Sequence, residues 1–378
     1  MPIVDGYRSI RLDIDIENHY HYLLSTIPER QSAIFFEHNG GKTMSGSQWG
    51  MRRGLMLAFI LMMALAMAAC GNGTNGTVDS GVGTGQTPQE ENNGGEPSGS
   101  GKVMTDALGH EVRIPANPQR ILASYLEDHL VALGIKPVAQ WSVANGKQEY
   151  LQSAGLQGVP AISYNLPVEE VLRFDPDFII IGSSALVQNG LYEQYAKIAP
   201  TYVLGDELIK DWRQTLLKIG ELLDRKEQAQ KVLDEYDAKA AEVKAKIAPV
   251  FEGKKAAILW IVQKSFYMVD ENLASGQVLY GDLGIRPSGL VLNLPKEAKA
   301  TWNPVTLEKL AELDADYIFL VNSDGPASKE VLDQPIWQGI PAVKENRVYE
   351  LPASSSWLYS GAIAGEQVMD DLVKFLAK

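Results

Sequence analysis

From residue 102 onward, short continuous runs of apolar residues alternate with segments in which apolar residues recur at helical spacing. Residues 178–181 are all apolar and lead into Gly182, which is typical of a buried parallel strand. Residues 121–123 predict a short strand, followed by a helix that stops at Gly134. This alternation predicts an α/β fold. Strands are predicted at residues 121–123, 137–141, 178–181, 256–262 and 317–321.

A helix followed by a strand occurs once in each half of this region, with the same local pattern. The predicted helix at residues 168–172 leads into one buried strand, and the predicted helix at residues 307–310 leads into another. A glutamate stands at the matching place in each unit, Glu169 in the first and Glu308 in the second. This repeat predicts two similar lobes. We place them at residues 102–207 and 249–378.

Between the two lobes, residues 208–248 contain no proline and a single glycine. Apolar residues recur there at helical spacing, and Pro249 follows directly. The segment therefore predicts one connecting helix of about forty residues, which would span about 60 Å at 1.5 Å per residue. Such a single crossover predicts a stiff hinge between the lobes.

Residues 51–69 have the pattern of a secretory signal, with a basic start, a short apolar run and small residues before Cys70. The apolar run is short for a transmembrane span. The segment from Met67 to Cys70 resembles the bacterial lipobox, in which the cysteine sulfur is lipidated. The alternative is a plain signal peptide with an incidental cysteine. Residues 70–101 are rich in Gly, Asn, Ser and Thr, which predicts a flexible tether behind the lipid anchor.

Residues 1–50 precede this signal, although a signal peptide should begin a protein. We expect a misassigned start, with Met51 or Met44 as the genuine first residue. An additional leader of unknown purpose is the alternative.

Composition excludes several classes of function. The formal net charge of −13 argues against nucleic acid as a partner, because phosphate binding needs clustered Lys and Arg. A single cysteine excludes an internal disulfide and a paired-cysteine metal site. Only His110 and His129 follow the signal, too few for a zinc or manganese site. We find no Gly-x-Ser-x-Gly elbow with a histidine partner and no Walker-type phosphate loop, so we expect no enzyme.

Several sequence pieces then appear in a specific order. They are residues 105–112 (Thr-Asp-Ala-Leu-Gly-His-Glu-Val), 114–121 (Ile-Pro-Ala-Asn-Pro-Gln-Arg-Ile), 132–138, and the strand leads at 176–177 and 315–316. In this combination residues 102–378 resemble the helical-spine periplasmic binding proteins for ferric siderophores, haem and cobalamin. The resemblance implies a class III periplasmic binding protein, with two similar Rossmann-like lobes joined by one long α-helix. It also implies a ligand held in a shallow cleft between the lobes.

The resemblance also implies a membrane partner. In such families one surface glutamate per lobe docks into basic pockets on the permease subunits of an ABC importer. By their position in the repeated unit, Glu169 and Glu308 match these glutamates. Glu170 competes with Glu169 in the first lobe, and a solvated helix face is the alternative for each.

Ligands of open α/β sheets bind beyond the carboxyl ends of the strands, and the loops there are rich in aromatic and hydroxyl side chains. Aromatic walls would bury the apolar rim of a ferric siderophore, and Arg or Lys would pair with its charge. Candidate walls are Tyr125, Trp141 and Trp357, although a loop tryptophan more often packs between lobe and spine. Candidate charge partners are Lys147, Lys264 and Arg286. The other candidate ligand-binding residues are Ser183, Tyr267 and Tyr359.

The sequence thus predicts a monomeric, lipid-anchored lipoprotein on the outer face of a Gram-positive-type cell membrane, which delivers a ferric siderophore to an ABC importer. No cofactor and no direct metal ligand are expected. Haem or cobalamin is the alternative cargo, because the family shares one fold. His129 is a possible haem ligand, but its place inside a predicted helix favours a core or surface role. The chelator class (catecholate, hydroxamate or carboxylate) stays open.

Overall fold

The structure is a computed structural model that describes residues 101–143, 146–294 and 301–376. The predictions for residues 1–100, which concern the start site, the signal, Cys70 and nearly all of the tether, lie outside the described residues. Within the described part, no helix combines the length and the apolar character that crossing a bilayer requires.

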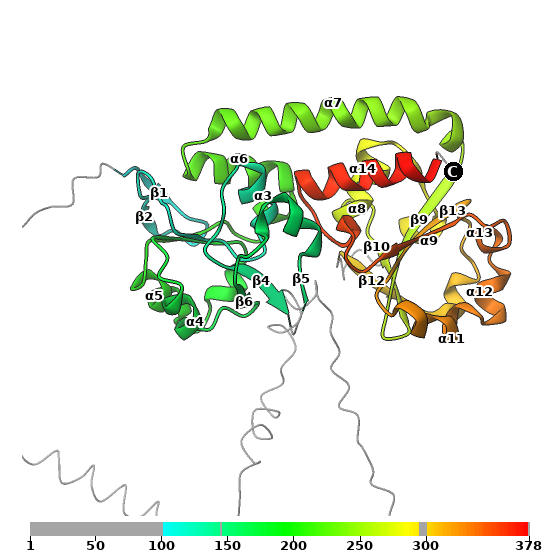
Figure 1. Cartoon of the computed structure of the whole chain (residues 1–378), viewed down its shortest axis with the longest axis horizontal. Coiled ribbons are helices and arrows are strands. Elements are labelled where there is room, and N and C mark those ends of the chain that lie inside the picture. Colours follow the sequence, from blue (N-terminus) through cyan, green and yellow to red (C-terminus); the bar gives the residue numbers. More distant parts are fainter. Residues whose placement is uncertain (1–100, 144–145, 295–300, 377–378) are drawn as a thin grey trace, which may run out of the picture. The chain divides into compact units, whose positions relative to one another are not determined.

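In the first half, the predicted apolar runs form two three-stranded sheets (Figure 1). One is parallel, in the order β3–β7–β8, and the other has the order β5–β4–β6. All four side chains of β7 are buried, as its continuous apolar run predicts. The predicted strand at 137–141 begins only at Gln140, because the backbone N–H of Val138 donates instead to the carbonyl of Ile121. The strands are β1 (Val103–Thr105), β2 (Glu111–Arg113), β3 (Ile121–Leu122), β4 (Gln140–Val143), β5 (Gly146–Lys147), β6 (Ala161–Ser163), β7 (Phe178–Ile181) and β8 (Thr201–Val203).

Short helices connect these strands. They are α3 (Glu127–Ala132), α4 (Val168–Arg173) and α5 (Leu191–Ala196), with the helical turns η1 (Glu149–Leu151), η2 (Gln152–Leu156) and η3 (Ser184–Val187). The helix predicted after β3 is therefore shorter than expected, because the chain first turns sharply at Tyr125, whose φ is 64°.

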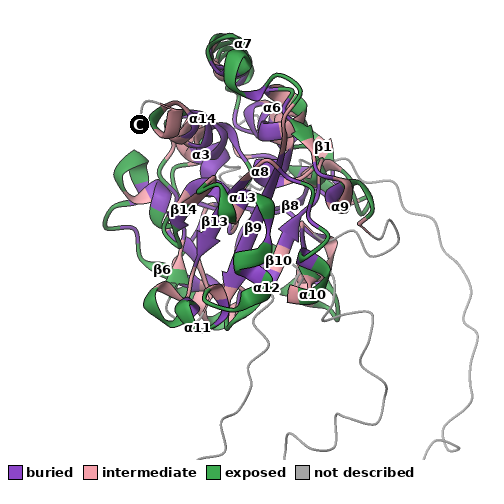
Figure 2. Ribbon diagram, turned by 90° about the vertical axis from the view of Figure 1, so that its right-hand side faces the viewer, coloured by how far each residue is buried: buried purple, intermediate pink, exposed green. Residues whose placement is uncertain are grey.

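The second half is built on one mixed sheet in the order β12–β10–β9–β13–β14, with β11 also pairing with β9. Alternate residues of β9 enter two apolar clusters, one on each face of the sheet. Figure 2 shows these central strands buried. The strands are β9 (Lys255–Val262), β10 (Ser265–Val269), β11 (Arg286–Pro287), β12 (Trp302–Val305), β13 (Tyr317–Asn322) and β14 (Val348–Pro352). The helices and turns are α8 (Ala274–Gly276), η5 (Gln277–Asp282), α9 (Gly289–Leu292), α10 (Leu307–Leu310), η6 (Gly325–Ser328), α11 (Lys329–Leu332), α12 (Pro335–Gly339), α13 (Pro341–Lys344), η7 (Ser356–Leu358) and α14 (Ala362–Leu376).

The segment from residue 208 to 248 is not one helix, which corrects the prediction of a forty-residue rod. It contains the turn η4 (Leu208–Lys210), the helix α6 (Trp212–Leu222) and most of the helix α7 (Lys226–Phe251). In Figure 1, α6 lies alongside α7 instead of continuing it. The long helix that joins the two halves is thus α7, whose 26 residues span about 39 Å at 1.5 Å per residue.

The break has a local cause. The helix α6 ends in a Schellman turn, in which Asp224 takes a left-handed φ of 57° and the N–H of Arg225 donates to the carbonyl of Gly220 at 2.6 Å. Gly220 also allows α7 to approach, because a Cβ there would lie 2.7 Å from the Cβ of Ala229. The one glycine of the segment is therefore the point where the two helices touch.

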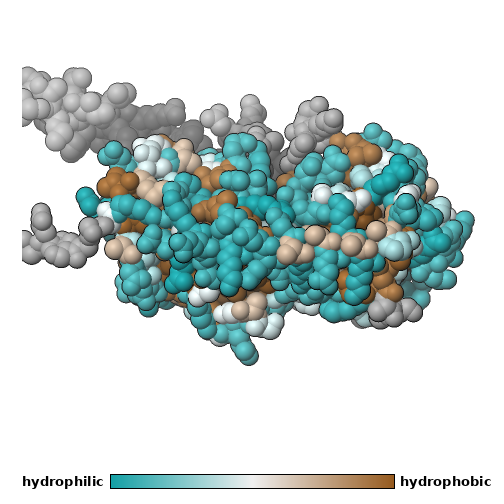
Figure 3. Space-filling view, turned by 90° about the horizontal axis from the view of Figure 1, so that it is seen from above, coloured by the Kyte–Doolittle hydropathy of each residue, from teal (hydrophilic) through white to brown (hydrophobic). Residues whose placement is uncertain are grey.

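The helix α7 buries a single stripe and exposes its other sides. The buried side chains recur every three or four residues: Ala229, Leu233, Tyr236, Ala240, Val243, Ile247 and Phe251. The face seen from the side of α7 is mainly hydrophilic (Figure 3). Pro249 does not end the helix as predicted. It lies in the last turn, where its missing N–H removes only one backbone hydrogen bond.

Two sets of contacts hold the halves together beside α7. The helix α14 packs against α7 and against α3 of the first half. Arg213 of α6 pairs with Asp237 of α7 at 3.2 Å and with Asp282 of η5 at 3.0 Å. The Tyr236 hydroxyl donates to Asp282 at 2.8 Å. All described residues belong to one compact unit.

Candidate functional site

Four aromatic side chains from both halves meet where α3 contacts the second half. The ring of Tyr125, which follows β3, lies 5.1 Å from that of Trp141 in β4, measured between centroids. The ring of Tyr359, which follows η7 in the second half, stacks on Tyr150 at 5.0 Å and lies 6.5 Å from Tyr125. We call these four residues the aromatic group. Because Trp141 and Tyr150 are only 2% and 5% exposed, Tyr125 and Tyr359 provide its accessible surface.

A buried carboxyl group fixes one side of the aromatic group. Glu127, at the start of α3, is fully buried, and its Oε1 accepts the backbone N–H of Trp141 at 2.6 Å. Burial raises the pKa of Glu127 to about 8, although the backbone N–H of Trp141 acts in the opposite direction. Glu127 is therefore mostly neutral at pH 7. Its Oε2 has no hydrogen-bond partner among the described residues.

Two more predicted ligand-binding residues lie at carboxyl ends of strands in the first half. Lys147 lies in β5, opposite Ser142 of β4, and its Nζ donates to Oε1 of Gln152 at 3.2 Å. Ser183 follows β7 but is 2% exposed, and its hydroxyl donates to Asp206 at 2.6 Å. Lys147 is thus near the aromatic group in the sheet, whereas the hydroxyl of Ser183 is engaged within its own half.

The second half corrects two of the predicted ligand contacts. Trp357 is fully buried, stacks on Phe319 at 4.9 Å and donates its indole N–H to Asp371 at 3.2 Å, so it packs in the core and forms no ligand wall. Arg286 pairs with Lys255 at the amino end of β9, opposite the carboxyl end where a ligand was expected.

Lys264 lies in the tight turn between β9 and β10, at the carboxyl end of β9, so its ligand-binding role stays a prediction. It forms a 2.5 Å ion pair with Glu330 of α11. Its charge is therefore already matched within the second half. Tyr267 of β10 is half-buried, and its ring lies 5.3 Å from that of Trp260, measured between centroids.

The structure separates the two competing glutamates of α4. Glu170 accepts hydrogen bonds from the backbone N–H of Ser163 at 3.0 Å and from its hydroxyl at 3.1 Å, so it supports β6. Glu169 is exposed, as is Glu308 in the first turn of α10. The helix α4 in Figure 1 and the helix α10 in Figure 2 both lie at the end of the molecule opposite α7. The two predicted docking residues therefore share one side.

The histidine considered as a haem ligand is enclosed. His129 is 6% exposed, and burial lowers its pKa to about 4, so the ring is neutral at physiological pH. Across the described residues, no three His, Cys, Asp or Glu side chains are grouped to hold a metal ion.

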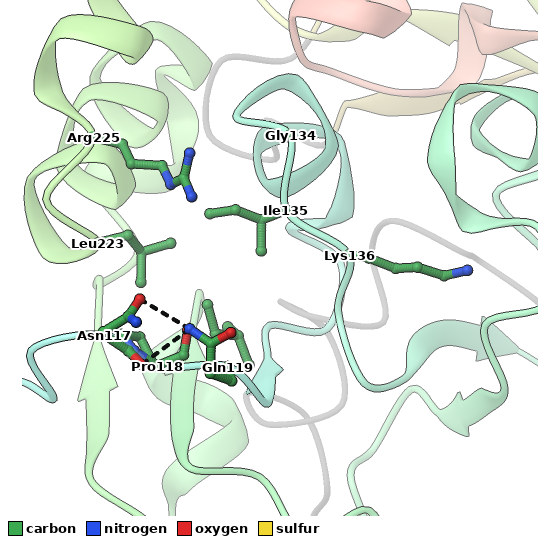
Figure 4. A pocket seen from close by; sticks show the side chains of 9 residues that line it. Asn117, Pro118, Gln119, Gly134, Ile135, Lys136, Leu223 and Arg225 are labelled. Atoms are coloured by element: carbon green, nitrogen blue, oxygen red, sulfur yellow. Dashed lines mark hydrogen bonds between the residues drawn. The ribbon is translucent and has the colours of Figure 1, made fainter.

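A cavity of about 220 Å³ lies away from the aromatic group, next to the break between α6 and α7 (Figure 4). Arg225 points into it, above Asn117 and Gln119, whereas the Lys136 side chain points away. Lys136 donates to the carbonyl of Gln157 at 3.0 Å. The cavity borders the amino end of β3, so it does not coincide with the predicted ligand site.

Sequence reasoning missed Tyr150, Glu127 and Asp128. The signal that was available is the acidic pair at the start of an otherwise apolar helix, since adjacent buried carboxyl groups need specific partners. Tyr150 carried no comparable signal, because it lies in a helical turn that follows a short edge strand.

The sequence and the fold both match characterised proteins. Residues 123–355 match the family model described as periplasmic binding protein. The chain is 27% identical over 308 residues to the iron-uptake system-binding protein of Bacillus subtilis, covering 79% of this chain and 90% of that protein. It is 28% identical over 269 residues to the iron(3+)-hydroxamate-binding protein YxeB of Bacillus subtilis, covering 68% of this chain and 80% of that protein.

Solved structures share the fold. An FhuD fold-family periplasmic binding protein from Bacillus subtilis, a component of a Fep/Fec-like ferrichrome ABC transporter, superposes with a TM-score of 0.62 at 24% identity, covering 73% of this chain and 100% of that one. Staphylococcus aureus SirA complexed with staphyloferrin B gives a TM-score of 0.60 at 24% identity, covering 73% and 98% of the respective chains.

Proposed function

Because the chain belongs to the periplasmic binding protein family, we propose that it captures a ferric siderophore outside the cytoplasm and delivers it to an ABC importer. Two relatives support iron as the cargo, since one is named for iron uptake and the other for binding iron(3+)-hydroxamate. The observation that carries the proposal is the aromatic group, because both halves contribute to it and two of its rings are accessible. Aromatic faces are suited to the apolar rim of a bulky chelate.

Ligand titration of the purified protein, followed by tryptophan fluorescence, tests this proposal. The panel comprises ferrichrome, ferric staphyloferrin B, the two iron-free chelators, haem and cobalamin. We expect saturable quenching by at least one ferric siderophore and weaker quenching by its iron-free form. Quenching by haem alone or by cobalamin alone would replace the siderophore by that ligand, and no response to the whole panel would refute the binding function.

We further propose that Glu169 and Glu308 contact the membrane subunits of the importer. Both glutamates are exposed, on helices at the same end of the molecule. Leu172, one turn from Glu169 in α4, is 61% exposed, the highest value among the large apolar side chains of the described residues. An acidic side chain beside an accessible apolar one fits a basic pocket with an apolar rim.

Reversing both charges tests the docking proposal. In the variant with Glu169→Lys and Glu308→Lys, we expect iron uptake by cells to fall by about tenfold or more, because like charges brought together at an interface cost several kcal/mol. Siderophore affinity of the purified variant should stay unchanged. Glu227→Lys, which reverses an exposed charge on α7 at the other end of the molecule, is the control and should transport normally. Normal uptake by the double variant would contradict the proposal.

We also propose that the mature protein is held at the membrane by lipid on Cys70. Two acyl chains on one residue suffice for stable anchoring, whereas a single chain does not. Cys70→Ser should therefore appear in the culture medium or the soluble fraction and should lose metabolic labelling with palmitate. Equal membrane retention and labelling of the variant would exclude this anchor.

A further inference from the structure

A buried carboxylate of α3 accepts hydrogen bonds from the second half of the molecule. Asp128 is 3% exposed and lies in α3 of the first half. Its Oδ1 accepts the backbone N–H of Ile363 at 3.1 Å, and its Oδ2 accepts that of Ala364 at 2.9 Å. Both donors belong to the first turn of α14. Asp128 therefore caps a helix of the other half, more than two hundred residues away along the chain.

The loop at Gly361, just before α14, leaves room for the Asp128 carboxylate only because it carries no side chain there. Gly361, just before α14, has a φ of 140°, and a Cβ there would lie 2.2 Å from the Cγ of Asp128. Any larger residue would have to push α3 and α14 apart. We call the contact of Asp128 with Gly361, Ile363 and Ala364 the cap joint.

The cap joint is continuous with the aromatic group. The Tyr150 hydroxyl donates to Oδ2 of Asp128 at 3.0 Å, and the Tyr150 ring stacks on Tyr359. Tyr359 lies two residues before Gly361, so its backbone is fixed by the same loop. Gln367 of α14 donates to the Tyr150 carbonyl at 3.2 Å. The Asp128 carboxylate, the Tyr150 hydroxyl and the stacked rings of Tyr150 and Tyr359 thus form one continuous set of contacts between the two halves.

The Asp128 carboxylate is buried and yet ionised at pH 7, which suits a cap at the amino end of α14. Burial raises the pKa of Asp128 to about 6, against the opposing effect of the backbone N–H groups of Ala364 and Ile363 and the Tyr150 hydroxyl. The carboxylate is therefore mainly ionised at pH 7. A negative charge at the amino end of a fifteen-residue helix is favourable, because the unpaired N–H groups there carry partial positive charge.

We propose that Asp128 is a positioning residue for ligand binding: through the cap joint it holds Tyr150 and Tyr359 at the spacing that the ferric siderophore requires. This inference rests on the proposed siderophore-binding function. Asp128 itself does not touch the ligand, and its effect passes through Tyr150 and through the loop at Gly361.

The test compares two carboxylates that each accept two backbone N–H groups at the start of a helix. Asp128→Asn weakens a cap between the halves, because the amide nitrogen would face the Ile363 N–H and leave that donor unpaired. Asp211→Asn is the matched control, since Asp211 accepts the N–H groups of Arg213 and Gln214 at the start of α6, within one half. Two readouts are measured on both variants: affinity for ferrichrome and ferric staphyloferrin B, and amide hydrogen exchange of Ile363 and Ala364.

For Asp128→Asn we expect affinity to fall about tenfold or more, the scale of one hydrogen bond to a charged group, with faster exchange at Ile363 and Ala364. For Asp211→Asn we expect affinity within about twofold of the wild type, because distant sites act independently. If Asp128→Asn keeps the wild-type affinity for the ferric siderophores although Ile363 and Ala364 exchange faster, Asp128 is only a helix cap and the proposal is overturned. Unchanged exchange would show that the cap joint does not form.

Failure of the variant to fold and failure of the wild type to bind can each be told apart from failure of the proposal. If Asp128→Asn does not fold, Tyr150→Phe keeps the ring and removes only the hydroxyl donor to Asp128, and the proposal then requires a measurable loss of affinity in that variant. If the wild type binds neither ferric siderophore, the proposed function fails and the positioning role fails with it. Hydrogen exchange of Ile363 and Ala364 would still decide whether the cap joint exists.

Discussion

Tyr359→Ala is expected to lower the affinity for a ferric siderophore by about 10- to 100-fold, which corresponds to a loss of about 1.4–2.8 kcal/mol. The accessible ring of Tyr359 comes from the second half and lies against Tyr125 and Tyr150 of the first half. Its removal therefore takes away ligand contact area and the contact between the rings at once. Fluorescence or calorimetric titration of the purified variant measures this change.

The matched control for this change is Tyr192→Ala. Tyr192 is also a half-buried, stacked tyrosine, with its ring 3.7 Å from that of His110, but it lies in α5 away from the aromatic group. The control should keep wild-type affinity. If both variants lose affinity equally, the loss reflects general destabilisation and the aromatic group is not the ligand site.

Glu127→Gln is expected to change how stability depends on pH. Burial raises the pKa of Glu127 to about 8 in the folded protein, from the usual 4.5 of a glutamate carboxyl. A raised folded pKa contributes stability that is fully present below the unfolded pKa and is lost as the pH rises through the folded pKa. Between pH 6 and pH 9, the wild type should therefore lose about 3 kcal/mol of unfolding free energy more than Glu127→Gln does.

Urea unfolding at several pH values measures this difference. Glu170→Gln is the control, because Glu170 also accepts a strand N–H, that of Ser163, but from a half-exposed position. The control should follow the wild-type slope. Parallel pH profiles for the wild type and Glu127→Gln would show that the Glu127 carboxyl is already ionised when buried, contrary to our account.

The strands of the fold were predictable because their signal is local. The continuous apolar run of β7 and the run of β9 were recognised within a residue of their ends, since each strand is buried on both faces. The two-lobe α/β class followed from the repeated helix-then-strand unit. Neither inference needed information on which segments meet in space.

The break between α6 and α7 could not be predicted from local sequence patterns. Apolar spacing continues across residues 208–248, so periodicity alone does not reveal the turn at Asp224. The break depends on Gly220, whose missing side chain allows α6 and α7 to touch at Ala229. The sequence pattern shows this glycine only as the single one within a predicted long helix, whereas in the structure it marks a close helix contact.

The grouping of the candidate ligand-binding residues was predictable in part, because a residue type indicates its chemistry but not the direction in which its side chain points. Tyr125, Trp141 and Tyr359 do lie together, as loops at strand ends suggested. Trp357 lies two residues before Tyr359, yet it turns into the core against Phe319. Its inward direction is set by the helical turn η7, which the sequence pattern did not reveal.

Equilibrium dialysis of the purified protein against a ferric siderophore labelled with radioactive iron tests the central claim most directly. We predict saturable retention of iron as the intact chelate, displaced by excess unlabelled complex and strongly reduced in the combined Tyr125→Ala and Tyr359→Ala variant. Retention no greater than that of the unfolded protein, or retention unaffected by removing both rings, would contradict the account.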